Sequence, residues 1–197
     1  MDHNIKKMEE YAKEYNIPIM LPDGIEFLLE YIKNNNVKNI LEIGTAIGYS
    51  AIRMCLINDN IKVTTIERDE NRYKEALNNI KLFNLEDRIN LIRSDAFDVI
   101  LNDKYDLIFI DAAKSQYIKF FEKFKIYLND NGSIVSDNLN FHGLTHTKEE
   151  IKSRNVRGIV RKLNNYIEFL NNNNEFKTEF YDIGDGISIS KINRRVL

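Results

Sequence analysis

The sequence predicts an α/β fold: a mostly parallel sheet of seven strands, with helices on both faces and an antiparallel hairpin at the C-terminal end. Short apolar runs alternate with longer segments of helical spacing, and the last two apolar runs are joined by a glycine-containing turn. Strand–helix alternation favours parallel strands joined by right-handed crossovers. The 197 residues, of which 43% are hydrophobic, are expected to form a single domain over 1–197.

Five apolar runs predict the parallel strands. They are apolar throughout rather than alternating, which is typical of strands covered on both faces. They span Asn39 to Ile43, Ile61 to Ile66, Ile89 to Ile92, Tyr105 to Ile110 and Ser133 to Ser136. Near the C-terminus, the extended segments Phe176 to Ile183 and Ile187 to Ile192 flank Gly184-Asp185-Gly186, whose glycines tolerate the positive φ angles of a hairpin turn.

Helical patterns lie between and around these runs. They cover Tyr49 to Leu56, Glu70 to Phe83, Gln116 to Leu128 and Glu149 to Leu170. Before the first strand, Asn4 to Tyr15 and Pro22 to Lys33 predict two further helices, the second with its proline in the first turn. We expect residues 1–35 to form a helical cap over a cleft at the strand ends.

Composition and charge exclude several classes of protein. The net charge is −2, so a nucleic-acid-binding protein would have to concentrate its 28 basic residues on one face. Cys55 is the only cysteine, which excludes an intrachain disulfide, and its apolar helical setting favours a buried thiol. The polar N-terminus lacks the apolar core of a signal peptide, and no apolar run approaches the ~20 residues of a membrane span. We therefore expect a cytoplasmic protein without membrane contact.

The segment Glu42 to Ser50, EIGTAIGYS, follows the first predicted strand and opens a helix. Parallel sheets bind ligands at the carboxyl ends of their strands, and the missing side chains at Gly44 and Gly48 are expected to let a ligand approach closely. The spacing differs from the dinucleotide fingerprint, and no Gly-Lys-Ser/Thr is present to hold phosphates. The segment therefore predicts a nucleoside site without a pyrophosphate.

Carboxylates follow the next two predicted strands. Glu67 ends the second strand, where a carboxylate can accept both hydroxyls of a ribose; a carboxylate at a helix start is the alternative. Asp95 ends the third strand and, with Ala96 and Phe97, is placed to contact an adenine ring. Together with the glycine loop, these residues predict S-adenosylmethionine as the cofactor.

Asp111 and the Asp137-Asn138 pair end the fourth and fifth predicted strands. Because these strands should be neighbours, the three side chains are expected to converge as oxygen ligands of a hard divalent cation such as Mg²⁺. The sequence does not choose between Mg²⁺, Mn²⁺ and Ca²⁺. A helix N-cap is the alternative for Asp111. His142 and His146 have the spacing of some zinc sites, but without a helical pattern a surface loop is favoured.

This arrangement predicts methyl transfer to a hydroxyl. A cation bound to two adjacent substrate oxygens lowers the hydroxyl's pKa and orients it towards the sulfonium methyl. Lys114, three residues beyond Asp111, is the candidate general base, and a solvated surface lysine is the alternative.

The motifs together resemble the cation-dependent O-methyltransferases, which include the catechol and caffeoyl-CoA enzymes. They are Glu-Ile-Gly-Thr-x-x-Gly-Tyr-Ser at 42–50, Glu67, Ser-Asp-Ala at 94–96, Asp-Ala-x-Lys at 111–114, Asp137-Asn138 and Gly-Asp-Gly at 184–186. The resemblance spans nearly the whole chain. It implies the Rossmann-like class I methyltransferase fold and, with the frequency of twofold assemblies, a homodimer.

The resemblance also implies roles for individual residues. The implied cofactor contacts are Met20, Glu42, Gly44, Thr45, Gly48, Ser50, Glu67, Arg68, Asp95, Ala96 and Asp111. The implied metal ligands are Asp111, Asp137 and Asn138, and the implied catalytic residues are Lys114 and Asp111.

Segments 17–28, 46–53 and 137–143 look closer to a bacterial branch, the tRNA 5-hydroxyuridine methyltransferases, which make 5-methoxyuridine at the wobble position. The 5-hydroxyl and the neighbouring 4-carbonyl would chelate a cation much as a catechol does. On this hypothesis the residues that contact the tRNA anticodon loop are Arg53, Arg154, Arg157 and Arg161. A solvated helix face paired with Glu149 and Glu150 is the alternative for the last three. A small catechol-like phenol is the alternative acceptor, and a cofactor-binding protein without catalysis is a third hypothesis.

Overall fold

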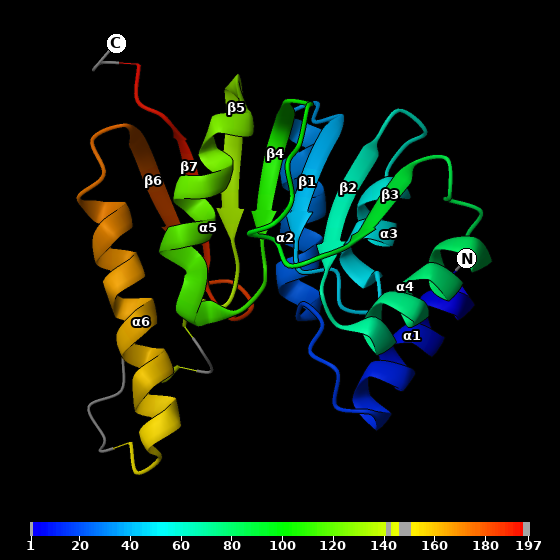
Figure 1. Cartoon of the computed structure of the whole chain (residues 1–197), viewed down its shortest axis with the longest axis horizontal. Coiled ribbons are helices and arrows are strands. Elements are labelled where there is room, and N and C mark those ends of the chain that lie inside the picture. The colour runs from blue at the N-terminus through cyan, green and yellow to red at the C-terminus, as the bar shows by residue number, and fades with distance from the viewer. Residues whose placement is uncertain (1, 141–142, 146–150, 195–197) are drawn as a thin grey trace.

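A seven-stranded sheet forms the centre of the computed structural model, which describes residues 2–140, 143–145 and 151–194 (Figure 1). Its order is β3-β2-β1-β4-β5-β7-β6. The strands are β1 (Asn39–Ile43), β2 (Lys62–Glu67), β3 (Ile89–Arg93), β4 (Tyr105–Ile110), β5 (Leu128–Ser136), β6 (Phe176–Tyr181) and β7 (Ile187–Ile192). The first five run parallel, and β7 is antiparallel to both β5 and β6. The predicted fold class is confirmed.

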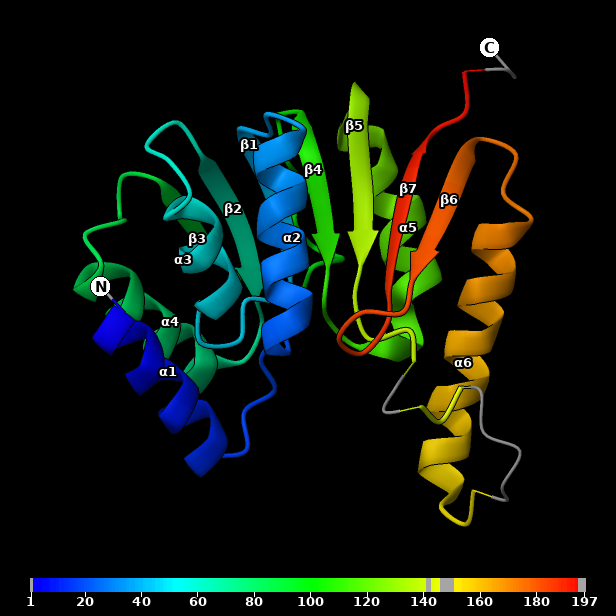
Figure 2. The same cartoon turned by 180° about the vertical axis from the view of Figure 1, so that it is seen from behind.

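Helices cover both faces of this sheet. They are α1 (Asp2–Glu14), α2 (Pro22–Asn34), α3 (Tyr49–Cys55), α4 (Glu70–Leu82), α5 (Tyr117–Phe124) and α6 (Arg154–Asn171), with short 3-10 turns η1 (Lys114–Gln116) and η2 (Lys125–Tyr127). Figure 1 shows α5 and α6 in front of the sheet, and Figure 2 shows α2 and α3 in front of the opposite face. As predicted, Pro22 opens α2.

The central strands are apolar throughout because they have a core on each side. In β4, Leu107 and Phe109 pack in one core with residues of α1 to α4, whereas Ile108 and Ile110 pack in the other with residues of α5 and α6. All four side chains are fully buried. Complete burial of such a side chain contributes about 1.5–3 kcal/mol, so these alternating contacts hold the two helical layers to one sheet.

Two predicted helices have different bounds in the structure. The helix predicted from Glu149 begins at Arg154, because the Ser153 hydroxyl caps it by accepting the Val156 N–H; Glu149 and Glu150 lie outside the described residues. The helix predicted over 116–128 ends at Phe124, and β5 begins at Leu128. This start of β5 was missed because residues 129–132, Asn-Asp-Asn-Gly, are of types depleted in strands; Leu128 pairs with Tyr105 of β4, and the register shifts before Ser133.

The β6–β7 turn supports the loop that follows β5. Gly184 and Gly186 have φ angles of 59° and 85°, as the hairpin prediction required. The turn also accepts two hydrogen bonds, from Asn140 N–H to the Asp185 carbonyl (2.7 Å) and from Leu139 N–H to the Gly186 carbonyl (2.9 Å). The C-terminal hairpin therefore fixes the chain directly after Asp137-Asn138.

Among the described helices, none is both long and apolar enough to cross a membrane.

Candidate active site

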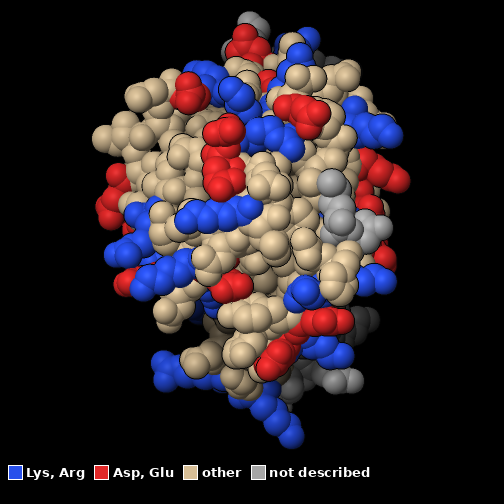
Figure 3. Space-filling model, turned by 90° about the vertical axis from the view of Figure 1, so that its right-hand side faces the viewer, with Lys and Arg blue, Asp and Glu red and all other residues tan. Residues whose placement is uncertain are grey.

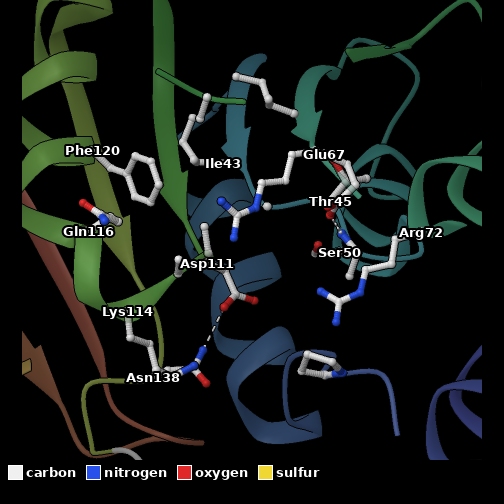
Figure 4. Close-up of a pocket in the computed structure, with 18 of the residues that line it drawn as sticks. Ile43, Thr45, Ser50, Glu67, Arg72, Asp111, Lys114, Gln116, Phe120 and Asn138 are labelled. Carbon is white, nitrogen blue, oxygen red and sulfur yellow. Dashed lines mark hydrogen bonds between the residues drawn. The ribbon is translucent and has the colours of Figure 1, made fainter. Parts of the chain in front are cut away.

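A cavity of about 390 Å³ opens at the carboxyl ends of β1, β2 and β4 (Figure 4). This volume lies in the range of small-molecule sites. The sequence-predicted residues that line it are Met20, Gly44, Thr45, Ser50, Glu67, Arg68, Asp95, Ala96, Phe97, Asp111, Lys114 and Asn138. They come from six separate chain segments, and the parallel topology brings them together at one edge of the sheet.

Glu42 and Gly48, also predicted as cofactor contacts, do not line the cavity. Glu42 is completely buried beneath it, where its carboxylate accepts hydrogen bonds from the hydroxyls of Ser50 and, at 2.5 Å, Thr65. Burial raises the pKa of Glu42 to about 7, against the opposing effect of these hydrogen bonds. Glu42 therefore holds residues of the cavity wall in place from behind.

The glycines of the loop serve chain packing rather than ligand access alone. A Cβ at Gly44 would lie 2.1 Å from the carbonyl oxygen of Asp111, and Gly44 has a φ of 102°. A Cβ at Gly48 would lie 3.5 Å from Ala76 of α4, which is an ordinary contact distance. Glycine is favoured at position 48 because the backbone there, at the start of α3, has a φ of 85°. Close packing and positive φ therefore add a second reason for glycine at these positions, and Gly44 also lines the cavity where a ligand was expected to approach.

Glu67 joins the glycine loop to the start of α4. Its carboxylate accepts the backbone N–H groups of Ala46 and Asp69, each at 2.9 Å. The N-cap of α4 is Asp69, which accepts the Arg72 N–H. Glu67 lies two residues before this cap and accepts its N–H, so it is also a carboxylate near a helix start, as the alternative interpretation proposed. Glu67 faces the cavity in Figure 4 and remains available to a ligand's hydroxyls.

Aromatic rings form another wall of the cavity. Phe97 stacks on Phe120 with ring centroids 4.9 Å apart. Beside them Asp95 accepts the Phe97 N–H at 2.9 Å and lies 3.6 Å from the Arg68 guanidinium. Phe120 was missed because its α5 position follows the apolar pattern of a core residue.

Asp111, Asp137 and Asn138 converge as predicted for the ends of neighbouring strands. The Asn138 amide donates to an Asp111 carboxylate oxygen at 2.9 Å (Figure 4). Asn138 has a φ of 66°, in the left-handed region that asparagine tolerates better than most residues. Ala113, not Asp111, occupies the N-cap position of η1, so the structure does not support the capping alternative for Asp111.

The electrostatics of this cluster are those of crowded carboxylates. Burial, followed by the charge of Asp111, raises the pKa of Asp137 to about 8. Burial also raises the pKa of Asp111, opposed by the Lys114 ammonium. Buried Asp185, from the Gly-Asp-Gly motif in the β6–β7 turn, raises both pKa values further, although no role at the site was assigned to it from the sequence.

A sequence model of the O-methyltransferase family matches residues 3–193. The chain belongs to this family. It is 28% identical to the caffeoyl-CoA O-methyltransferase of Populus kitakamiensis, over 93% of this chain and 81% of that one.

Solved structures agree with this assignment. A Staphylococcus aureus protein, provisionally described as a caffeoyl-CoA O-methyltransferase, has a TM-score of 0.92 and 38% identity, covering 96% of this chain and 92% of its own. The Bacillus cereus O-methyltransferase solved with S-adenosylhomocysteine has a TM-score of 0.82 at 23% identity, covering 98% and 92%, and shows the shared fold.

This O-methyltransferase uses S-adenosylmethionine, and its cavity has suitable chemistry for that cofactor. The Glu67 carboxylate faces the cavity as an acceptor for hydroxyls, and Phe97 and Ala96 supply apolar surface for a base. No phosphate-binding sequence is present, in keeping with a cofactor that carries no phosphate.

The acid–amide cluster of the O-methyltransferase also fits a divalent cation. Asp137 Oδ1 is buried and accepts no hydrogen bond among the described residues. Burying a carboxylate oxygen without a hydrogen-bond partner, beside a second carboxylate, costs free energy unless a positive charge compensates it. Among the described residues no three His, Cys, Asp or Glu side chains form a metal cluster, so a cation site here requires the Asn138 amide as well.

The four arginines proposed for RNA lie away from the cavity lining. Arg53 is held inside the protein by hydrogen bonds to the Tyr49 hydroxyl and the Glu26 carboxylate. Arg154, Arg157 and Arg161 are all exposed, and Arg157 donates to the carbonyls of Ile151 and Lys152. His142 and His146 lie outside the described residues.

Proposed function

We propose that this protein catalyses cation-dependent methyl transfer from S-adenosylmethionine to a hydroxyl with a second oxygen beside it, as in a small catechol-like phenol. The observation that carries the proposal is the buried, unbonded Asp137 oxygen, which lies behind the cofactor cavity beside Asp111 and Asn138, two residues that line it. The caffeoyl-CoA enzyme among the relatives supports an acceptor of this class.

In this proposal Asp111, Asp137 and Asn138 hold the cation, for which Mg²⁺ is the first candidate. A bound cation supplies a lowered pKa for the acceptor hydroxyl and a fixed orientation for its two oxygens. Lys114 lines the cavity next to Asp111. Its ammonium must first release a proton to solvent, and the neutral amine would then accept the hydroxyl proton at Nζ. The hydroxyl oxygen then forms its bond to the methyl carbon while the carbon–sulfur bond breaks, leaving S-adenosylhomocysteine.

The remaining residues position the reactants. Glu67 accepts the ribose hydroxyls, and Ala96 contacts the adenine. The stacked pair of Phe97 and Phe120 keeps water from this side of the cavity. Exclusion of water strengthens the electrostatic interactions on which the transfer depends.

The test measures methyl transfer to a panel of catechols with Mg²⁺, with a chelator, and with Mg²⁺ restored. We expect transfer to require the cation and Asp137→Asn to reduce kcat at least 100-fold while S-adenosylhomocysteine binding, measured by calorimetry, is retained. Asp130→Asn is the matched control, because Asp130 is an exposed carboxylate at the opposite end of the same strand. Full activity of Asp137→Asn in the presence of chelator would refute the cation mechanism.

A second candidate acceptor is wobble 5-hydroxyuridine of tRNA, and one observation favours it. Basic side chains project at the lower end of the molecule in Figure 3, and Figure 1 shows the N-terminal part of α6 at that end, beyond the carboxyl ends of the parallel strands. Arg154 and Arg161 are exposed on this part of α6. Phosphate contacts there would place a nucleic acid across the opening of the cavity.

The two acceptors are separated by labelled methyl transfer to hydroxylated tRNA and to the catechol panel in parallel. Selective loss of tRNA methylation in an Arg154→Gln, Arg161→Gln double variant would support the RNA substrate. Labelling of catechols alone would exclude the RNA substrate.

We also propose that the protein is cytoplasmic and forms a homodimer. Light scattering, which measures the mass of the particle in solution, tests the dimer.

A further inference from the structure

Arg72 lines the cofactor cavity from the first turn of α4, although no motif in the sequence pointed to it. In Figure 4 its guanidinium points into the cavity on the side where Ser50 and Glu67 lie. Its backbone N–H is used by the Asp69 cap, which fixes where the side chain leaves the helix. An arginine in this position presents a cation to the cofactor.

Three basic residues line the described part of the cavity: Arg68, Arg72 and Lys114. Of these, Arg72 has no close acidic partner among the described residues. Among the lining residues, Arg68 lies 3.6 Å from Asp95, and Lys114 lies within the electrostatic influence of Asp111. Arg72 makes no ion pair within 4.0 Å to any described residue, although its charge is one cause of the lowered pKa of exposed Asp69 at the start of the same helix. A guanidinium directed into a binding cavity without such a partner is suited to an anionic group of the ligand.

S-adenosylmethionine carries one anionic group, the carboxylate of its methionyl part. With the ribose at Glu67 and the adenine at Ala96, the sulfonium must face Asp111 and Lys114 for transfer to occur. The methionyl chain then runs along the wall made by Ser50 and Met20, and Arg72 adjoins this part of the cavity. The guanidinium fork matches a carboxylate in shape and charge.

We propose that Arg72 binds the methionyl carboxylate of S-adenosylmethionine and thereby selects cofactors that carry the amino-acid part. The proposal rests on the cofactor orientation given in the proposed function, with the ribose at Glu67 and the sulfonium towards Lys114. It does not depend on the identity of the acceptor or on the cation, so it can fail or succeed independently of the proposed substrate. Arg72 is a binding residue on this proposal, with no part in proton transfer.

The test compares two ligands by calorimetry with the full-length protein. S-adenosylhomocysteine has the carboxylate, and 5′-methylthioadenosine has the same adenosine and sulfur without the amino-acid part. We expect Arg72→Gln to weaken S-adenosylhomocysteine binding about tenfold, the effect of one charge-assisted contact, and to leave methylthioadenosine binding unchanged. Arg72→Lys should weaken S-adenosylhomocysteine binding by an intermediate factor, because lysine keeps the positive charge but lacks the paired N–H donors of the guanidinium.

Lys74→Gln is the matched control: it removes the same charge from the same helix, outside the cavity, where Lys74 pairs with Glu70 at 2.7 Å. It should alter neither affinity. Thermal unfolding without ligand establishes that the variants are folded, which the exposure of Arg72 favours. Equal weakening of both ligands would place Arg72 at the adenosine instead, and no change in either would remove it from the site. Both outcomes would overturn the proposal.

Discussion

Gly44 packs directly on the carbonyl oxygen of Asp111, since a Cβ built at Gly44 would lie only 2.1 Å from that atom. The contact joins the glycine loop after β1 to the end of β4, where the acid–amide cluster begins. Asp111 N–H also donates to the Ile43 carbonyl at 3.0 Å, which extends the β1–β4 pairing to the edge of the cavity. The cofactor loop and the proposed cation site are therefore one packed unit.

Gly44→Ala should damage both parts of this unit. The methyl group would collide with the backbone, and the φ of 102° is unfavourable for alanine, so we expect a loss of about 2–4 kcal/mol in the free energy of unfolding. Urea denaturation measures it, and calorimetry should show loss of S-adenosylhomocysteine binding.

Gly158→Ala provides the matched control. Gly158 lies within α6, and a Cβ there meets nothing within 4 Å. Alanine should raise stability by up to about 1 kcal/mol through its helix propensity. Equal effects of the two substitutions would contradict the packing explanation for Gly44.

Glu42 should make stability depend on pH. Its pKa is raised from 4.5 to about 7, chiefly by burial, so the folded state binds this proton more tightly than the unfolded state. The resulting stabilisation is complete below about pH 4.5 and is lost as the pH rises to about 7, by about 3 kcal/mol. Glu42→Gln should flatten this part of the profile, measured by urea denaturation at each pH.

The control for Glu42 is Glu70→Gln. Glu70 is exposed, and a hydrogen bond from Lys74 lowers its pKa, so its replacement should leave the profile from pH 5 to 8 unchanged. A Glu42→Gln profile parallel to that of the original protein would show that Glu42 does not titrate in this range.

Arg53 should act in packing the N-terminal helices rather than in binding RNA. It donates to Tyr49 at 2.9 Å within α3 and pairs with Glu26 of α2, while the Tyr49 hydroxyl donates to Glu9 of α1 at 2.7 Å. Burial, reinforced by Glu9, raises the pKa of Tyr49 to about 12, so its hydroxyl stays protonated as a donor.

We expect Arg53→Ala to cost about 1 kcal/mol of stability and to weaken cofactor binding, because Met20 follows α1 and lines the cavity. Methylation of tRNA and of catechols should fall by the same factor. A double-mutant cycle with Glu26→Gln should give a coupling of at most about 1 kcal/mol, since Glu26 is largely exposed. If Arg53→Ala reduced the methylation of tRNA but not of catechols, Arg53 would again be a candidate for RNA binding.

Lys114→Ala should reduce kcat about 100-fold or more, the usual contribution of a positioned general base, without weakening S-adenosylhomocysteine binding. Single-turnover methyl transfer measures the chemical step. Lys119→Ala removes an exposed lysine five residues later and should have no effect. Unchanged turnover of Lys114→Ala would assign proton transfer to another group.

Some site residues could be predicted because they belong to local patterns. Glu67 and Asp111 follow strands that are recognisable from their own sequence, and a parallel sheet places all such strand ends at one edge. Others could not. Phe120 reaches the site from an amphipathic helix, and nothing in its neighbouring residues distinguishes it from an ordinary core position. Asp185 belongs to the Gly-Asp-Gly motif, but its place beside Asp111 and Asp137 depends on the packing of the hairpin.

By itself the sequence determined the order of strands and helices and the positions of the acidic strand ends, because apolar periodicity and turn residues act over a few neighbours. It also determined membership of the O-methyltransferase family through its motifs. Only the tertiary structure decided what each residue contacts. Gly44 packs against Asp111, the Glu42 carboxylate binds the Ser50 hydroxyl, Arg53 of α3 pairs with Glu26 of α2, and Arg72 lines the cavity. The physical reason is that these contacts join residues distant in the chain or depend on the direction of a side chain, which packing fixes and sequence spacing does not encode.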